Sequence, residues 1–75
     1  MPRKLRELRR DLRREGYSPD RQTGSHQIWE HPAVPGFSVN LAGRDGADAQ
    51  RYQEELVRDG IRRARVARQR KEHGE

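Results

Sequence analysis

The apolar residues near the start of the chain follow the spacing of a helix. Leu5, Leu8 and Leu12 recur at intervals of three and four residues among charged neighbours. This spacing places the three leucines on one face of a helix. Pro2 suits a helix start, and Gly16 stands where a C-terminal cap belongs. The pattern therefore predicts an amphipathic N-terminal helix that ends at about Gly16.

The stretch 17–41 lacks a helical period and predicts strands joined by turns. The first strand, 17–22, is interrupted by Pro19. Because proline cannot donate to a strand ladder, this favours an edge strand or a late strand start. A glycine-containing turn leads into the second strand, 26–30. A loop rich in proline precedes 37–41, where apolar and polar residues alternate as in a half-buried strand. The short connections predict an antiparallel meander.

A second helix follows a glycine-containing loop. Asp48 can cap its first turn. Tyr52, Leu56 and Val57 are expected to form its buried stripe, and Gly60 is expected to mark its end.

The predicted order is helix, three strands, helix, which is an α+β fold of two layers with both helices on one face of the sheet. The domain should cover residues 1–61. Residues 62–75 carry six basic and two acidic side chains and only one large apolar one. We expect this basic tail to be a frayed helix or disordered.

Composition adds constraints on class and partner. Seventy-five residues fit one domain with a thin core, and the chain has no cysteine for disulfides or thiolate metal sites. No apolar run is long enough to span a membrane, and no secretory signal is visible, so we expect a cytoplasmic protein. The net charge of +5 is typical of chains that bind nucleic acid. The arginines of the first helix could equally be a solvated face or a guide for a polyanion.

His26 is the sharpest candidate for chemistry. It follows a glycine–serine turn at the start of a strand, and a histidine can take and give protons in RNA cleavage. The alternative is an ordinary surface histidine. His31, at the far end of the strand, should point to the other face and belong to a loop. No zinc spacing or carboxylate cluster is present, so we expect neither a metal nor a cofactor.

Three further polar side chains near this turn could bind phosphate. Arg21 and Arg44 flank the turn in the predicted meander, and Ser25 lies within it. Solvation of the two arginines is an equal alternative, and turn serines usually bind local backbone. Trp29 could stack on a base, but a lone tryptophan in so small a domain is expected in the core.

One run of residues gives these candidates a family context. The segment 21–26, Arg-Gln-Thr-Gly-Ser-His, followed by Ile-Trp and His-Pro, resembles the HicA (YcfA-like) toxins. The resemblance covers roughly 3–61, including Gly-Tyr at 16–17 and Gly-Ile at 60–61. The residues after the third strand and at the start of the second helix depart from the family pattern.

This resemblance implies a fold like the double-stranded-RNA-binding domain and ribonuclease activity on mRNA. It also implies that His26 is catalytic and that a HicB-type antitoxin occludes the site. The leading hypothesis is a metal-independent endoribonuclease in which His26 is the general base. Arg21, Arg44 and the backbone N–H groups of Gly24 and Ser25 would bind phosphate. Homo-oligomers are expected only within the toxin–antitoxin complex.

Two other functions remain open on the same fold. The chain could be a non-catalytic module that binds RNA duplexes through its basic residues. It could also be a protein-interaction module that docks through the open face or an edge of its sheet.

Overall fold

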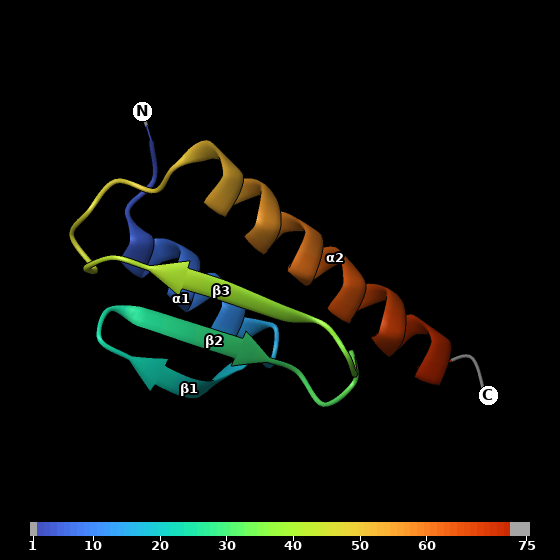
Figure 1. Ribbon diagram of the computed structural model, residues 1–75. Helices are drawn as coiled ribbons and strands as arrows, with labels where there is room; N and C mark the ends of the chain where they lie inside the picture. Colours follow the sequence, from blue (N-terminus) through green and yellow to red (C-terminus); the bar gives the residue numbers. More distant parts are fainter. Residues whose placement is uncertain (1, 73–75) are drawn as a thin grey trace.

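The computed structural model describes residues 2–72, the side chains of the last two excepted. The elements follow one another in the predicted order, α-β-β-β-α (Figure 1). Their bounds are α1 Leu5–Arg14, β1 Ser18–Thr23, β2 His26–Glu30, β3 Ser38–Ala42 and α2 Arg51–Glu72. The α+β class is confirmed.

The three strands form an antiparallel meander in the order β1-β2-β3. β1 is therefore an edge strand, as Pro19 predicted. The pairing of β1 with β2 shifts between Pro19 and Arg21, so Asp20 forms an irregularity of the bulge type. All six residues of β1 are exposed, whereas Val39 and Leu41 of β3 are buried. The sheet thus has one covered and one open face.

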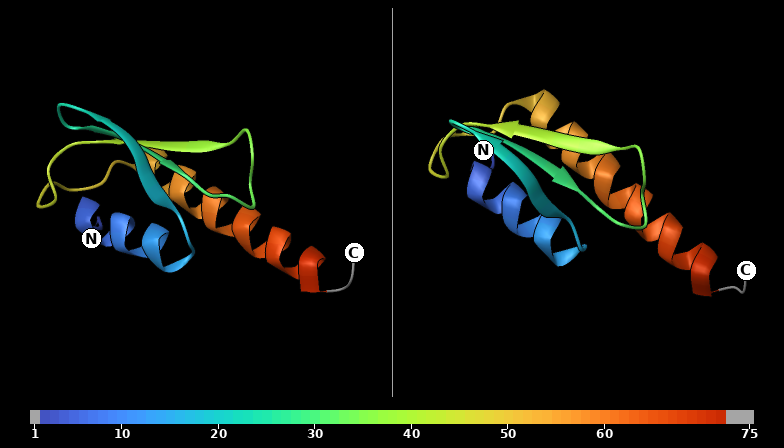
Figure 2. Two further views of the ribbon diagram at one scale, coloured as in Figure 1. Left: turned by 90° about the horizontal axis from the view of Figure 1, so that it is seen from below. Right: turned by 60° about the horizontal axis from the view of Figure 1, so that its bottom comes forward.

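Both helices lie on the covered face of the sheet (Figure 2). Trp29 is fully buried from the sheet side, and the three leucines of α1 are almost fully buried from the helix side. Burial of large apolar side chains contributes roughly 1.5–3 kcal/mol each to folding. The core residues are Leu5, Leu8, Leu12, Tyr17, Trp29, Val39, Leu41, Ala49, Val57 and Ala64.

α1 ends in the cap that its glycine predicted. Gly16 has a φ of +102°, the N–H of Tyr17 donates to the carbonyl of Leu12, and that of Gly16 donates to Arg13. This pair of hydrogen bonds is the Schellman arrangement, in which the residue after the helix adopts a left-handed conformation. The cap turns the chain sharply and delivers Tyr17 to the core.

The buried stripe of α2 matches the prediction only in part. Tyr52 is 59% exposed, so its assignment to the buried stripe is wrong. Val57 is buried as predicted, and Leu56 is partly buried. The helix also directs Gln53 and Ala64 inward. Gln53 is satisfied where it lies, because its Nε2 donates to the carbonyl of Ala42 at 3.1 Å.

The start of α2 also differs from the prediction. Asp48 does not cap the helix; its carboxylate pairs with Lys4 at 2.6 Å, and the two residues form an isolated β-bridge. Gln50 takes the capping position, since its N–H donates to the Oε1 of Gln53 at 2.8 Å. Asp48 therefore fastens the loop before α2 to the N-terminal segment.

Gly60 lies within α2, so the prediction that the helix ends there is wrong. A β-carbon at this position would lie 3.1 Å from Val39 and 3.3 Å from the Tyr17 hydroxyl. The glycine is needed for close approach of helix to sheet, and the helix continues to Glu72. Tertiary contacts outweigh the modest helix penalty of one glycine.

The basic tail, as far as residue 72, is helix held by contacts with the body of the domain. Ala64 is buried, and Glu15 at the end of α1 binds Arg65 and Arg68, each at 3.0 Å. The side chain of Glu15 is only 12% exposed, so this pairing is better sheltered than most surface ion pairs. His73 and the last two residues lie outside the described part of the chain.

Tyr17 links α2 to the core and should make stability depend on pH. Its hydroxyl donates to the Gly60 carbonyl at 2.7 Å, and burial raises its pKa above the ordinary 10.0. Because the neutral form is favoured in the folded state, its contribution is present below pH 10 and lost as pH rises through the raised pKa. Replacement by phenylalanine should lower the free energy of unfolding by about 1 kcal/mol at neutral pH.

The measurement is urea unfolding of both proteins from neutral to alkaline pH. The difference between wild type and Tyr17→Phe should shrink above pH 10. A difference that stays constant across this range would contradict the assignment.

Candidate functional site

The β1–β2 hairpin presents His26 at the first position of a strand. The connection has two residues, Gly24 and Ser25, and Thr23 pairs with His26 across it. Gly24 has a φ of +60°, and no residue other than glycine has a positive φ among those described. Positive φ at the first turn position alone fits a type II′ turn. His26 is thus an exposed side chain on a rigid strand.

His26 lines a small hollow of about 90 Å³ on the open face of the sheet. The strand register explains how the hollow forms. Ile28 pairs with Arg21 on one side and with Asn40 on the other, so these three side chains share the face of His26. The residues that line it are Arg21, Thr23, His26, Ile28 and Asn40.

The structure therefore brings two of the predicted site residues together, His26 and Arg21, with Gly24 and Ser25 in the adjoining turn. The N–H groups of the turn residues lie beyond the last strand pair, while the carbonyl of Ser25 accepts from the N–H of Gly43 at 3.3 Å. That bond joins the turn to the loop after β3.

Arg44 lies in this loop and does not line the hollow. It is exposed and follows Gly43, so its backbone lies near the turn, but its side chain is separate from the pair Arg21–His26. Both arginines were predicted to flank the turn. The side chain of Arg21 does so at the hollow, whereas only the backbone of Arg44 lies near the turn.

Arg9 is a site-supporting residue that the sequence did not reveal. The arginines of α1 were expected to form either a solvated face or a guide for a polyanion, yet Arg9 is only 6% exposed. Its guanidinium donates to the Gln27 Oε1 at 2.7 Å, to Asp45 at 2.5 Å and to the Gly43 carbonyl at 2.6 Å. Arg9 thus ties α1 to the residue after His26 and to both neighbours of Arg44.

We call the three hydrogen bonds of Arg9 the Arg9 clamp. Its loss should loosen the loop at residues 43–45 before it disturbs the core. Arg9→Met keeps the apolar stem but removes three hydrogen bonds, and should lower the free energy of unfolding by about 2 kcal/mol. The exposure of Asp45 keeps the cost below that of a fully buried pair. Amide hydrogen exchange should show faster opening at residues 43–45 than in α1. Equal protection of that loop in both proteins would contradict the clamp.

His31 has a structural role at the opposite end of β2. Its Nδ1 accepts from the N–H of Ala33 at 3.0 Å, which leaves Nε2 to donate to the Glu15 carbonyl at 2.8 Å. Its ring meets Tyr17 edge-on, with centroids 4.9 Å apart. As predicted, His31 belongs to a loop and shares no site with His26.

Trp29 is core, as expected, since it is fully buried beneath the sheet. The guanidinium of Arg13 lies 5.1 Å from its ring centroid, a cation–π distance. The indole Nε1 has no hydrogen-bond partner among the described residues. Trp29 is therefore not available to stack on a base.

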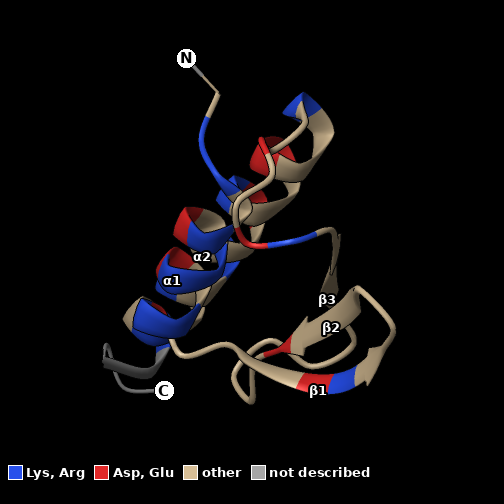
Figure 3. Cartoon of the chain, turned by 90° about the vertical axis from the view of Figure 1, so that its left-hand side faces the viewer, with Lys and Arg blue, Asp and Glu red and all other residues tan. Residues whose placement is uncertain are grey.

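Charge is distributed very unevenly between the two layers. Figure 3 shows Lys and Arg, with Asp and Glu among them, concentrated on both helices, while β2 and β3 are almost free of charge. The arginines of α1 therefore lie on the far side of the sheet from His26. Arg21 is the cation that β1 adds to the hollow.

Neither helix within residues 2–72 combines the length and apolar content needed to cross a membrane. That same part of the chain holds no group of three or more His, Cys, Asp or Glu side chains placed to bind one metal ion.

Comparison with known proteins places the chain in a family. Residues 5–54 match the family model described as the HicA toxin of bacterial toxin–antitoxin systems. No curated protein and no solved structure matches the chain. The matched region runs from the first residue of α1 into the first turn of α2 and so contains the complete sheet, the hairpin with His26 and the Arg9 clamp. It covers well over half of the sequence, and the chain therefore belongs to the HicA family of bacterial toxins.

Proposed function

We propose that this toxin is a metal-independent endoribonuclease that cleaves mRNA in the cytoplasm and so blocks translation. One observation carries the proposal: an exposed histidine at the rigid start of β2 shares a hollow with an arginine on the open face of the sheet. A proton acceptor beside a cation can support phosphodiester cleavage at a site without a metal.

His26 acts as the general base in this mechanism. It removes a proton from the ribose 2′-hydroxyl, and the resulting oxygen attacks phosphorus. The bond from phosphorus to the 5′-oxygen then breaks, which gives a 2′,3′-cyclic phosphate and a 5′-hydroxyl end. Water, or the protonated His26, supplies the proton to the leaving oxygen. If His26 instead activates water, the product is a phosphate monoester.

Cations and backbone donors stabilise the charge that develops on phosphate. Arg21 lines the hollow and would contact the phosphate directly. The N–H groups of Gly24 and Ser25, which lie beyond the strand ladder, would donate to the same oxygens. Arg44 would bind a neighbouring phosphate from the loop that Arg9 holds.

The partner that neutralises the toxin is proposed to be a HicB-type antitoxin that covers this hollow. Family membership supports an antitoxin partner, and the exposed open face offers the surface to be covered. Self-association of the toxin would then occur only within the toxin–antitoxin complex.

A direct test is cleavage of a defined mRNA by the purified protein in the presence of EDTA. We expect cleavage to persist with EDTA and to stop when the ribose 5′ of the cut site carries no 2′-hydroxyl. Loss of cleavage on chelation, restored by a divalent cation, would refute the metal-independent mechanism. Cleavage of the 2′-deoxy substrate would indicate that His26 activates a water molecule and not the 2′-hydroxyl.

The arginine-rich helical layer favours one alternative, a non-catalytic RNA-binding module. Its arginines lie opposite the hollow and would contact phosphates of a duplex without placing RNA at His26. Binding that weakens steeply with salt, with intact RNA recovered, would support this alternative.

A further inference from the structure

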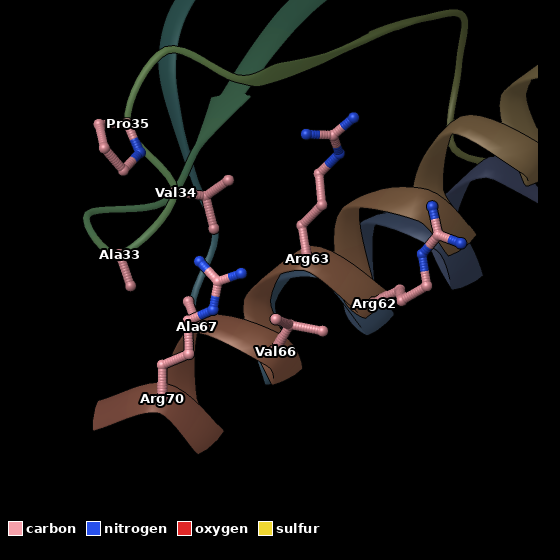
Figure 4. A pocket seen from close by; sticks show the side chains of 8 residues that line it. All are labelled: Ala33, Val34, Pro35, Arg62, Arg63, Val66, Ala67 and Arg70. Atoms are coloured by element: carbon pink, nitrogen blue, oxygen red, sulfur yellow. The ribbon is translucent and has the colours of Figure 1, made fainter. Parts of the chain in front are cut away.

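A second concave surface lies between the β2–β3 loop and the last turns of α2 (Figure 4). It has a volume of about 320 Å³. Its apolar residues are Ala33, Val34, Pro35, Val66 and Ala67, and its charged residues are Arg62, Arg63 and Arg70. We call this surface the α2 groove. It depends on the continuation of α2 past Gly60.

The apolar part of the α2 groove is open to solvent. Val66 is 42% exposed, and Ala33 and Pro35 of the facing loop are also exposed. In Figure 4, Val34 and Ala33 point toward α2, so side chains from both elements face the same space. An exposed apolar surface with a charged rim is typical of protein-interaction sites.

The charge of the groove is positive. Arg62 and Arg63 both bind Asp59, and their hydrogen bonds, that of Arg63 first, hold the pKa of this carboxyl below its usual value. Arg63 also stacks on Phe37, with 4.4 Å from guanidinium carbon to ring centroid. Asp59 pairs with two of the three arginines, so the rim keeps a net positive charge that suits anionic side chains.

The α2 groove is distinct from the hollow at His26. The loop residues of the groove follow the end of β2, whereas His26 is the first residue of that strand. Five extended residues separate the two by on the order of 15 Å. A ligand in the groove therefore leaves the hollow uncovered.

We propose that the α2 groove binds an acidic amphipathic segment of a partner protein. Its carboxylates pair with the arginines of the rim, and its apolar side chains cover Val66 and the Ala33–Pro35 loop. A nucleic-acid strand fits less well, because a phosphate backbone offers nothing to cover the apolar floor. This proposal does not depend on ribonuclease activity.

The test uses a capped, fluorescent peptide of Glu, Leu and Ala patterned as an amphipathic helix. Binding to the full chain is followed by anisotropy. Two further peptides separate the contribution of charge from that of apolar contact. One has Lys in place of Glu, and the other has Ala in place of Leu. A short duplex RNA is the fourth probe.

Arg70→Glu reverses a charge on the rim, and Val66→Asp places a carboxylate in the apolar part of the groove. Each should weaken binding of the acidic peptide by about tenfold. Arg51→Glu makes the same change of net charge at the other end of α2, on a side chain that is 92% exposed, and should leave binding unchanged. Circular dichroism should show all three variants folded, because each side chain is exposed.

Three results would overturn the proposal. One is equal binding of the acidic and the Lys peptide, and another is equal loss of affinity in Arg51→Glu and Arg70→Glu. The third is RNA binding that depends on Arg70 and Val66 while the acidic peptide does not bind.

Discussion

Expression of the His26→Ala variant in a bacterial host is expected to leave growth and mRNA intact, whereas wild type arrests growth and degrades mRNA. In the purified protein, loss of a general base should lower the cleavage rate by roughly 10²–10⁴-fold. The substitution should not unfold the domain, since the His26 side chain is exposed.

A matched control for this experiment is His31→Gln, at the other end of β2. Its amide keeps a donor for the Glu15 carbonyl, but the ring contact with Tyr17 is lost. We expect a lower melting temperature with cleavage retained below it. Full activity in His26→Ala would remove this residue from the chemistry. Arrest without RNA cleavage in both variants would point to sequestration of RNA.

Replacement of Gly16 by alanine is expected to be among the most destabilising single-methyl additions. At a φ of +102°, an alanine is strained, and its β-carbon would lie 2.6 Å from the Nε2 of His31. The histidine would have to move and give up its bond to the Glu15 carbonyl. Strain and lost contacts together should lower the free energy of unfolding by about 3 kcal/mol.

Gly36→Ala separates backbone strain from the clash. Gly36 has a φ of +81°, and nothing lies within 4 Å of its added β-carbon. This variant should therefore lose only about 1 kcal/mol, from strain alone. Thermal unfolding of the two variants measures the difference. Equal losses would show that His31 moves away without cost.

Much of the fold could be predicted because local patterns agree with the tertiary structure. The leucines of α1 keep a strict helical spacing, and all three are buried. Pro19 marks an edge strand, and Gly16 a cap, because each residue restricts or frees its own backbone.

The register of α2 could not be predicted in the same way. The sheet approaches so closely at Gly60 that small residues and Gln53 face it, while the larger Tyr52 turns to solvent. A hydrophobic pattern registers the size and polarity of a side chain, not the distance at which two elements pack. Gly60 was therefore interpreted as a helix end, although it marks a close contact between α2 and the sheet.

The residues of the candidate site also differ in whether local sequence patterns could place them. His26, Arg21 and the turn could be placed because hairpin geometry is local. Asn40 was missed, although strand alternation and a correct register would have put it on the face of His26. The burial of Arg9 had no local signal, since its partners lie 18 to 36 residues away in the sequence.

The burial of Ala64 has a consequence for the order of events during synthesis. The hairpin with His26 is translated early, but the helical layer that supports its sheet is incomplete until α2 has left the ribosome as far as Ala64. The contacts of α2 with α1 and with β3 therefore form last, and they join distant parts of the sequence. Until α2 has docked, the hairpin that carries His26 therefore has an incomplete core behind it.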